Sequence, residues 1–405
     1  MRRLAMLLAV VAVAASSAFA IVPAAAADSG FVSWIASFRK TAIDAGVRPS
    51  IYDSAFAGID APDPEVIQAA NYQPEFTDKV WEYMDTRITE SIVSTGREQR
   101  RQLQRWLDLI EKRFGVDRDT VLAIWSMESS YGEALKTGKG IRKVARSLAT
   151  LGYADARRAK FARTQLIAAL KIAQTGDVSP AGLTGSWAGA MGHTQFIPTS
   201  YLAWAVDIDG DGKRDIWNSV PDALASAANL LAKNGWRTGR TWGYEVAFSN
   251  PGLARLEGQT MTLSQWSAKG VKRVAGRAFA RGDDKAVLML PAGTNGPAFL
   301  LLRNFYVLKR YNNADKYALA VGLLADQIAG HGGLVRDWPR GYVLLNEEER
   351  REAQRALLRL GLYDGEIDGK FGPGTKKAVM AFQSNKGIEI NGYPSKTLLE
   401  NLRRN

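Results

Sequence analysis

Glu128 is the residue whose position in the sequence most favours acid–base chemistry. The sequence predicts a helix over residues 117–132. Val121, Ile124, Trp125 and Glu128 stand at i, i+3, i+4 and i+7, which places them on one face of that helix. The first three are apolar, so the Glu128 carboxyl group lies at the end of an apolar face. A carboxyl group on such a face is partly removed from water and lies near the negative end of the helix dipole, so it tends to keep its proton. A neutral Glu that faces a cleft can act as a general acid. The segment alone leaves open the alternative that the carboxyl group reaches solvent at the end of the helix.

The ends of this helix are also marked in the sequence. Asp117 can cap the N-terminus with its side chain, and Asp119 places a negative charge near the positive end of the dipole. Gly132 is of the residue type that most often follows the last helical turn. The pattern therefore predicts that Glu128 lies near the C-terminal end of a short helix.

A second candidate segment, residues 182–201, surrounds single polar groups with glycine and alanine. The polar groups are Ser186, His193 and Gln195. Glycines let a backbone approach a ligand or another chain segment closely. The composition fits contact with a substrate and tight internal packing equally well, and it does not decide between them.

A third pattern is acidic and has the spacing of an EF-hand-type calcium loop. Oxygen ligands are expected at its positions 1, 3, 5, 7 and 9 from Asp207, Asp209, Asp211, the carbonyl of Lys213, and Asp215. Gly212 stands at position 6, where the loop turns sharply. Position 12 is Asn218 in place of the usual bidentate Glu, so either the affinity is weak or another residue substitutes for that ligand. The alternative is a polar turn that binds no ion.

Composition restricts where the protein works and what it binds. Residues 1–27 combine a basic start, an apolar run and small residues, which predicts a secretory signal peptide too short to span a membrane. The chain contains no cysteine, which excludes disulfides, thiol nucleophiles and a lipid anchor on cysteine. The formal net charge is +12. For an exported chain this charge favours an anionic envelope polymer over nucleic acid.

The remaining pattern predicts a mainly α, or α+β, fold. Amphipathic stretches dominate residues 28–115, 142–175, 222–234, 304–311 and 314–329. Two apolar runs, 286–290 and 298–302, flank a segment with glycine and proline and predict a small β-hairpin. After a boundary near 331–343, three short helices are predicted within 344–405, the first capped by Asn346.

Taken in order, the motifs resemble those of the B-type lytic murein transglycosylases of the bacterial periplasm. The resemblance rests on Ile124–Gly132, Gly185–Pro198, Val206–Gly212 and Arg310–Asn312, and covers roughly 30–335, within a catalytic domain expected over 28–335. Residues 344–405, with Gln354, Asp368–Gly372 and Phe382-Gln383, are similar to a peptidoglycan-binding module. The resemblance implies a lysozyme-like catalytic domain followed by a binding module.

The resemblance also implies an activity and site residues. Members of this family cleave the β-1,4 bond from N-acetylmuramic acid to N-acetylglucosamine and leave a 1,6-anhydromuramyl end. Glu128 stands at the position of their single catalytic acid. Positions that contact sugar in the family are occupied here by Ser186, Gln195, Met127, Tyr83, Tyr153, Tyr311 and Asn312. The family's calcium loop matches the Asp207 segment, and no organic cofactor is expected.

Two other functions remain as alternatives. A hydrolytic muramidase would use Glu128 with a second carboxylate, for which Glu133 is nearest in the sequence. A non-catalytic wall-binding protein would keep the fold without the chemistry. On the main hypothesis the partner is the peptidoglycan glycan strand, and the protein is a periplasmic monomer without a membrane anchor. Deleting residues 344–405 should then weaken binding to sacculi and leave turnover of short glycans largely intact.

Overall fold

The computed structural model describes residues 28–71, 79–388 and 392–404, so the predicted signal peptide lies outside the described residues. The described helices are α1 (Ser29–Asp44), α2 (Pro49–Phe56), α3 (Pro64–Asn71), α4 (Val80–Arg87), α5 (Glu90–Gln102), α6 (Gln104–Phe114), α7 (Arg118–Ser129), α8 (Glu133–Thr137), α9 (Val144–Ala154), α10 (Ala159–Thr175), α11 (Pro198–Trp204), α12 (Val220–Lys233), α13 (Leu263–Ala268), α14 (Arg303–Tyr311), α15 (Asp315–Ile328), α16 (Glu347–Arg359), α17 (Pro373–Asn385) and α18 (Lys396–Arg403). The strands are β1 (Arg142–Lys143), β2 (Thr184–Gly185), β3 (Gly243–Ala247), β4 (Thr260–Thr262), β5 (Lys272–Arg273), β6 (Lys285–Met289) and β7 (Ala298–Leu301). In the described part of the chain, no helix has the length and apolarity needed to cross a membrane.

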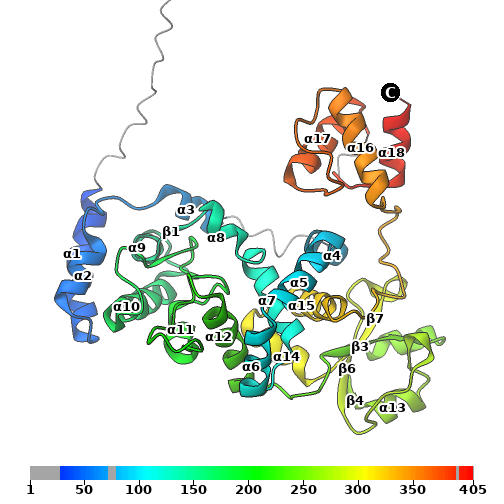
Figure 1. Ribbon diagram of the computed structural model, residues 1–405, viewed down its shortest axis with the longest axis horizontal. Helices are drawn as coiled ribbons and strands as arrows, with labels where there is room; N and C mark the ends of the chain where they lie inside the picture. The colour runs from blue at the N-terminus through cyan, green and yellow to red at the C-terminus, as the bar shows by residue number, and fades with distance from the viewer. Residues whose placement is uncertain (1–27, 72–78, 389–391, 405) are drawn as a thin grey trace, which may run out of the picture.

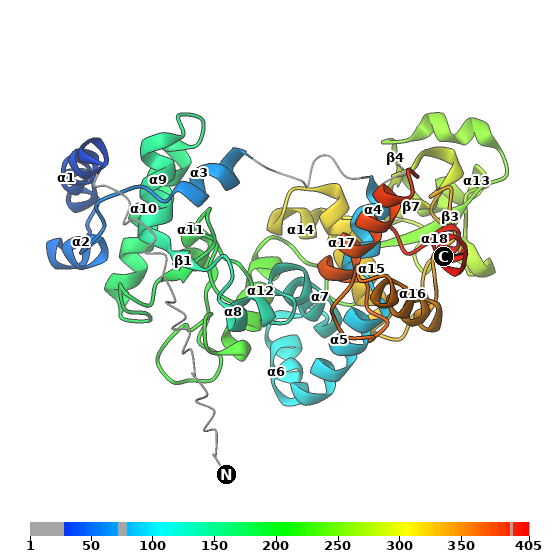
Figure 2. The same ribbon diagram turned by 90° about the horizontal axis from the view of Figure 1, so that it is seen from above.

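The mainly helical prediction is confirmed, with α7 near the centre of the molecule. Seen from above, α1 and α2 lie at one end, β4 and α13 lie at the other, and α7 lies between them (Figure 2). Nearly every residue of α7 is buried, and Val121, Leu122 and Ile124 have no exposed surface. The helix packs against α5, α12 and α15 (Figure 1). A helix surrounded in this way is held rigidly, which suits it to carry a functional side chain.

The predicted hairpin exists and belongs to a larger sheet. β6 and β7 pair antiparallel, with Val287 opposite Leu301, within the strand order β4-β6-β7-β3-β5. The sheet has its own apolar core, which includes Leu263, Trp266 and Leu300. β4 and β5 are three and two residues long, which is too short for an alternating pattern to be read in the sequence.

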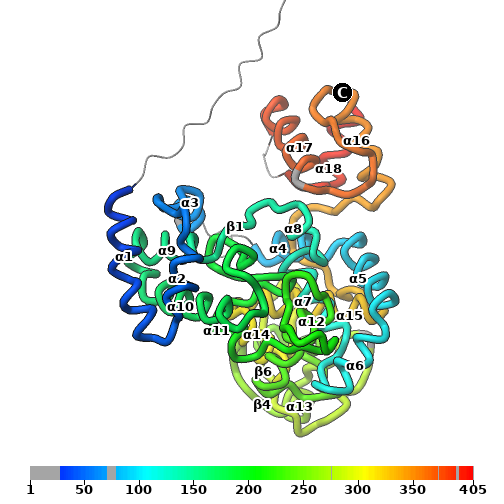
Figure 3. The backbone as a smooth tube through the Cα atoms, turned by 60° about the vertical axis from the view of Figure 1, so that its left-hand side comes forward, coloured from blue at the N-terminus to red at the C-terminus, as the bar shows by residue number. Residues whose placement is uncertain are grey.

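The C-terminal helices α16, α17 and α18 form a separate unit with a core of its own. Leu357, Val379, Phe382 and Leu399 are buried together there. The predicted cap is present, because the Asn346 side chain accepts from the backbone of Glu349 while the Glu349 side chain accepts from the backbone of Asn346. This unit lies next to α4 and α5 of the larger part in both views (Figure 1 and Figure 3).

Candidate functional site

The ends of α7 differ from the sequence prediction. Asp117 occupies the N-cap position, but its side chain makes no capping hydrogen bond, and burial raises the pKa of its carboxyl group. The last helical residue is Ser129, three residues before Gly132. Ser130 and Tyr131 follow in the left-handed region, with φ of 51° and 57°. Residues other than glycine adopt this conformation at a cost, which the surrounding contacts must offset.

Those contacts come from His193, on the segment between β2 and α11. The Ser129 hydroxyl donates to the His193 carbonyl at 2.6 Å and accepts from the Gly132 amide at 3.1 Å. The Trp125 indole donates to Nδ1 of His193 at 3.1 Å. Burial lowers the pKa of His193, which keeps the ring neutral and leaves Nδ1 as the acceptor. A segment 64 residues further along the chain therefore fixes the end of the helix that carries Glu128.

Glu128 is the half-buried residue between buried neighbours in the last turn of α7. Its Oε1 accepts a hydrogen bond of 2.6 Å from the hydroxyl of Tyr317 on α15. Burial and the nearby charge of Glu128 raise the pKa of Tyr317, so the phenol remains a donor. The arrangement gives the carboxyl group one fixed oxygen and access to the surface, which is the geometry that a general acid needs.

Tyr311 links this pair to the second candidate segment. Its ring stacks on that of Tyr317 with centroids 6.4 Å apart and planes 10° apart. Its hydroxyl donates to the carbonyl of Thr194 at 2.5 Å. Thr194 is the neighbour of Gln195 in the sequence, so the tyrosine connects α14, α15 and the polar segment around Glu128.

The glycines of the polar segment serve its internal packing. A Cβ at Gly192 would lie 2.3 Å from the Ile216 carbonyl, and one at Gly185 would lie 2.3 Å from the Ala190 carbonyl. Ser186 closes a tight loop, in which its hydroxyl accepts from the Ala190 amide at 3.1 Å. Gln195 has φ of 50°, and its side-chain amide donates to the Gly192 carbonyl at 2.8 Å. Close packing is therefore present, and it holds two half-buried polar side chains in fixed positions.

The other predicted sugar contacts lie in different surroundings. Met127 is buried in α7, and Tyr83 is buried on α4, which packs against α15, the helix that carries Tyr317. Asn312 follows α14 and accepts from the Ala314 amide at 3.1 Å. Tyr153 contacts the start of α1, where its ring meets Phe31 at 5.4 Å and its hydroxyl reaches Asp28 at 3.4 Å. Tyr311 thus stacks on Tyr317 and Tyr83 lies on a helix packed against α15, whereas the contacts of Tyr153 join α9 to α1.

Sequence reasoning did not assign a role to Tyr317, Ser129 or His193. The one feature of the sequence that points to Tyr317 is its residue type, because a tyrosine inside the apolar helix 315–328 needs a hydrogen-bond partner for its hydroxyl. Its partner is Glu128, 189 positions away in the sequence, which no local pattern indicates.

A cavity of about 680 Å³ lies at the opposite end of α7 from Glu128. Asp117, Asp119 and Asp326 line it together with Trp242 and residues of the sheet. Since neither Glu128 nor Tyr317 is among its lining residues, this cavity is separate from the candidate site.

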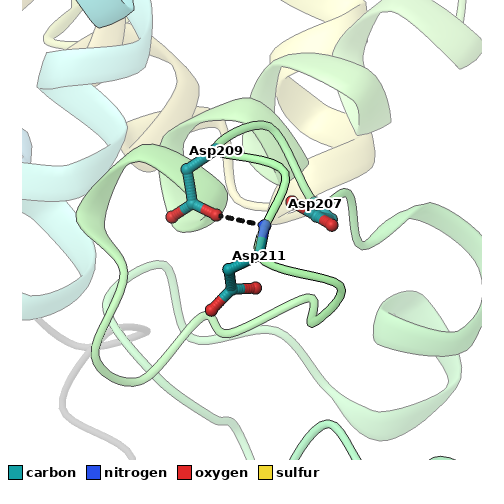
Figure 4. Close-up of side chains that lie close together, drawn as sticks. All are labelled: Asp207, Asp209 and Asp211. Carbon is teal, nitrogen blue, oxygen red and sulfur yellow. Dashed lines mark hydrogen bonds between the residues drawn. The ribbon is translucent and has the colours of Figure 1, made fainter.

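The acidic loop brings together three of the predicted metal ligands. Carboxylate oxygens of Asp207, Asp209 and Asp211 lie within 4.8 Å of one another (Figure 4). Within the described residues, none of the three forms a salt bridge with a basic side chain. The Asp207 carboxylate accepts from the amides of Gly210 and Gly212, at 2.6 and 2.9 Å, which closes the turn. The donor set, hard carboxylate oxygens, fits calcium.

Asp215 lies outside this group of three. Its carboxylate accepts from the amide of Trp217 and from the backbone and side chain of Asn218. A residue not predicted, Asp222, anchors both ends of the loop: its two oxygens accept from the amides of Ile208 and Asp215, each at 2.9 Å. Asp222 is fully buried on α12, so the loop is attached to the helical core.

Two known protein families match this chain. The model of the transglycosylase SLT domain family matches residues 30–326. The chain belongs to this family. A putative peptidoglycan binding domain matches residues 346–402. The predicted relationship to the lytic murein transglycosylases, with a lysozyme-like fold and a C-terminal peptidoglycan-binding module, is confirmed.

Several characterised SLT-family proteins are similar to this chain. Membrane-bound lytic murein transglycosylase B of Escherichia coli K12 is 32% identical over 216 residues, which are 53% of this chain and 58% of that protein. SltB3 from Pseudomonas aeruginosa, in complex with NAG-NAM-pentapeptide, is 45% identical, with a TM-score of 0.74 over 93% of this chain and 100% of that one. The same protein is known with NAG-anhNAM-pentapeptide. The E. coli transglycosylase Slt35 in complex with calcium is 27% identical, with a TM-score of 0.62 over 75% of this chain and 93% of that one.

Proposed function

We propose that this chain is a lytic transglycosylase that cleaves the β-1,4 bond between N-acetylmuramic acid and N-acetylglucosamine in peptidoglycan and leaves 1,6-anhydromuramyl ends. The observation that carries the proposal is the half-buried Glu128 carboxyl group, held by Tyr317 at 2.6 Å in the last turn of a buried helix. The SLT family and the anhydromuramyl ligand of SltB3 support the same activity.

One carboxyl group is sufficient for this reaction. Glu128, as the acid, donates its proton to the glycosidic oxygen as the bond to C1 of the muramyl residue breaks. The resulting carboxylate then takes the proton of the C6 hydroxyl as that oxygen closes onto C1. Glycosidases that use water need a second carboxylate to activate it or to form an adduct. Here the substrate's own C6 hydroxyl replaces water.

The surroundings of Glu133 argue against the hydrolytic alternative. Glu133 is exposed at the start of α8 and lies 3.7 Å from the ammonium group of Lys136. A solvated, paired carboxylate of this kind is a poor candidate for the second group of a muramidase. The non-catalytic alternative is disfavoured because Glu128, Tyr317 and Tyr311 form a continuous set of contacts around one carboxyl group.

We assign substrate binding to the polar groups near Glu128 and to the C-terminal module. Residues 28–335 form the proposed catalytic domain and residues 344–405 the proposed peptidoglycan-binding domain. The proposed sugar contacts are Ser186, Gln195, Met127, Tyr83, Tyr311, Asn312 and, further from the acid, Tyr153. Ser186 and Gln195 are half-buried with fixed side chains, which suits them to bind acetamido groups.

We also propose one structural calcium ion, bound by Asp207, Asp209 and Asp211. Their mutual proximity and the calcium complex of Slt35 support the assignment. The carbonyl of Lys213 and the carboxylate of Asp215 complete the predicted set. The two hydrogen bonds that the Asp222 carboxylate accepts would connect the ion-bound loop to α12.

The proposed location is the periplasm, where the substrate lies. It is supported by the signal-peptide pattern of residues 1–27 and by relatives that are murein transglycosylases. The monomeric state, the absence of a membrane anchor and the absence of nucleic-acid binding stay predictions from the sequence.

Mass analysis of the muropeptides released from purified sacculi tests the activity. The expected product carries 1,6-anhydromuramyl ends, which are lighter than hydrolytic ends by one water and resist borohydride reduction. Reducible muramic acid ends released by the wild-type protein would instead establish the muramidase.

A further inference from the structure

Helix α4 is too short to hold its own position. It has eight residues, and isolated helices below about 12 residues are marginal in water. Its buried face consists of Val80, Tyr83 and Met84, and it packs against α15, which carries Tyr317. Contacts on the opposite face must therefore help to determine where Tyr83 lies relative to the Glu128–Tyr317 pair.

The segment that connects the two domains is attached to the catalytic domain along its length. The Glu245 carboxylate accepts from the backbone amides of Val335 and Arg336, each at 2.8 Å. Trp338 is buried, with its ring 6.4 Å from that of Phe299 in β7. Residues 335–342, here called the strap, therefore form an ordered connection and not a free tether.

The strap is joined to α4 by an ion pair of low exposure. The Arg340 guanidinium makes two hydrogen bonds to the Asp85 carboxylate, one of them 2.9 Å long from Nε. The two side chains are only 14% and 13% exposed. A charge left without its partner in such a place is strongly unfavourable, so the pair constrains α4 to the strap.

The C-terminal module makes a second attachment to α4. The ring of Tyr393 stacks on that of Tyr342 in the strap at 5.1 Å. Burial and a hydrogen bond to Glu82 of α4 raise the pKa of Tyr393, so its phenol is a stable donor to that carboxylate. Glu82 also accepts from the Lys79 amide at 3.0 Å, at the first turn of α4. The module and the strap thus contact α4 at Glu82 and Asp85, about one turn apart on the face opposite Val80, Tyr83 and Met84.

We propose that Arg340 and Tyr393, through Asp85 and Glu82, form a clasp that positions α4 and places Tyr83 beside the Glu128–Tyr317 pair. The clasp makes the C-terminal module part of the catalytic unit as well as a binding module. Turnover of short glycans, too small to reach the module, therefore depends on it. This inference rests on the proposed transglycosylase function and reverses the expectation that deleting the module leaves such turnover intact.

The test uses the full-length protein and a short soluble glycan. Arg340→Ala should lower kcat about tenfold, since a displacement of about 1 Å in an active site has effects of this order or larger, with KM changed by less than about threefold. The charge-swapped double variant Arg340→Asp with Asp85→Arg should recover most of kcat. Tyr393→Phe keeps the stacked ring and loses the bond to Glu82, so kcat should fall about threefold.

Glu90→Gln is the matched control. Glu90 also faces the module, 4.0 Å from Arg350, but it is 74% exposed and lies on α5. Its removal should leave kcat unchanged. The clasp is overturned if kcat is unchanged in both Arg340→Ala and Tyr393→Phe. It is also overturned if the charge-swapped double variant has the melting temperature of the wild-type protein but a kcat as low as that of Arg340→Ala. A wild-type protein that releases no anhydromuramyl ends rejects the proposed function, a result distinct from any ratio between variants.

Discussion

The Glu128 site and the Asp207–Asp211 loop are built in opposite ways. The loop takes its three acidic side chains from five consecutive residues, and two of the bonds that close it come from its own amides. The Glu128 site takes its parts from α7, from the segment around His193 and from α14 and α15, and its central hydrogen bond spans 189 positions. A local motif can therefore be recognised as a unit, whereas an assembled site shows only its separate members in the sequence.

The difference extends to how each region depends on the rest of the fold. The loop is attached to α12 by Asp222 and by the Ser219 hydroxyl, which donates to Asp209 at 2.7 Å. Glu128 needs Ser129 and Trp125 to fix the helix end, and Tyr317 to orient its carboxyl group. Changes at the loop should thus alter stability without abolishing chemistry, and changes in the assembled site should alter the chemistry first.

The largest effect is expected for Glu128→Gln, which keeps the shape of the side chain but removes its proton-transfer function. General acid–base assistance is worth about 10²–10⁴-fold, and here one residue serves both half-reactions, so the loss of turnover should reach the upper part of that range. Binding to sacculi should persist. Glu133→Gln, at an exposed carboxylate five residues away, is the control and should be fully active. An active Glu128→Gln would remove this residue from the mechanism.

A smaller effect is expected for Tyr317→Phe, which tests whether a residue that the sequence did not indicate belongs to the site. A hydrogen bond to a charged group contributes about 1.5–3 kcal/mol, so kcat should fall roughly 10–100-fold. The ring can still stack on Tyr311, so the melting temperature should change little. Tyr306→Phe, on the exposed face of α14, is the matched control. Equal rates for the two variants would show that the Tyr317 hydroxyl has no role in turnover.

The acidic loop should respond in stability and not in chemistry. An ion that binds only the folded protein adds about 2.7 kcal/mol at a hundredfold excess over Kd. Millimolar calcium should therefore raise the melting temperature of the wild-type protein, and Asp211→Ala should abolish the rise. Asp283→Ala, at an exposed position in the sheet region, should retain it. No shift in the wild-type protein, together with no heat of binding in calorimetry, would make the loop a plain polar turn.

The smallest effect concerns Asp326, a half-buried acid on α15. Burial raises the pKa of Asp326, at the far end of α15 from Tyr317, to about 6, with Trp242 donating to the carboxylate at 3.1 Å. Because the pKa is higher in the folded than in the unfolded protein, the protonated group favours folding. This contribution to stability is complete below about pH 4, where both states are protonated, and it is lost as the pH rises through 6. Asp326→Asn should therefore raise the free energy of unfolding by about 1–2 kcal/mol at pH 7.5, relative to wild type. At pH 4 the two proteins should have the same stability. A gain that does not depend on pH would contradict this assignment.

Several elements could be predicted because their signals are local. The stripe of α7, the cap at Asn346 and the β6–β7 hairpin each depend on residues within a few positions, and each is present. Predictions that were wrong concern helix ends. Asp117 makes no capping bond. Helix α7 ends three residues before Gly132, because the hydrogen bonds that Ser129 and Trp125 donate to His193 stabilise a left-handed turn at Ser130 and Tyr131. Such tertiary bonds outweigh the local preference for glycine.

The sequence by itself determined the helical class of the chain, the acidic loop and the position of Glu128 on an apolar face, since helical periodicity and ligand spacing are properties of neighbouring residues. The tertiary structure decided which phenol meets Glu128, how the polar segment is tied to α7, and that the connecting strap holds α4 through Arg340 and Asp85. These contacts join residues from 68 to 255 positions apart, and their energies depend on burial and geometry that exist only once the helices have packed.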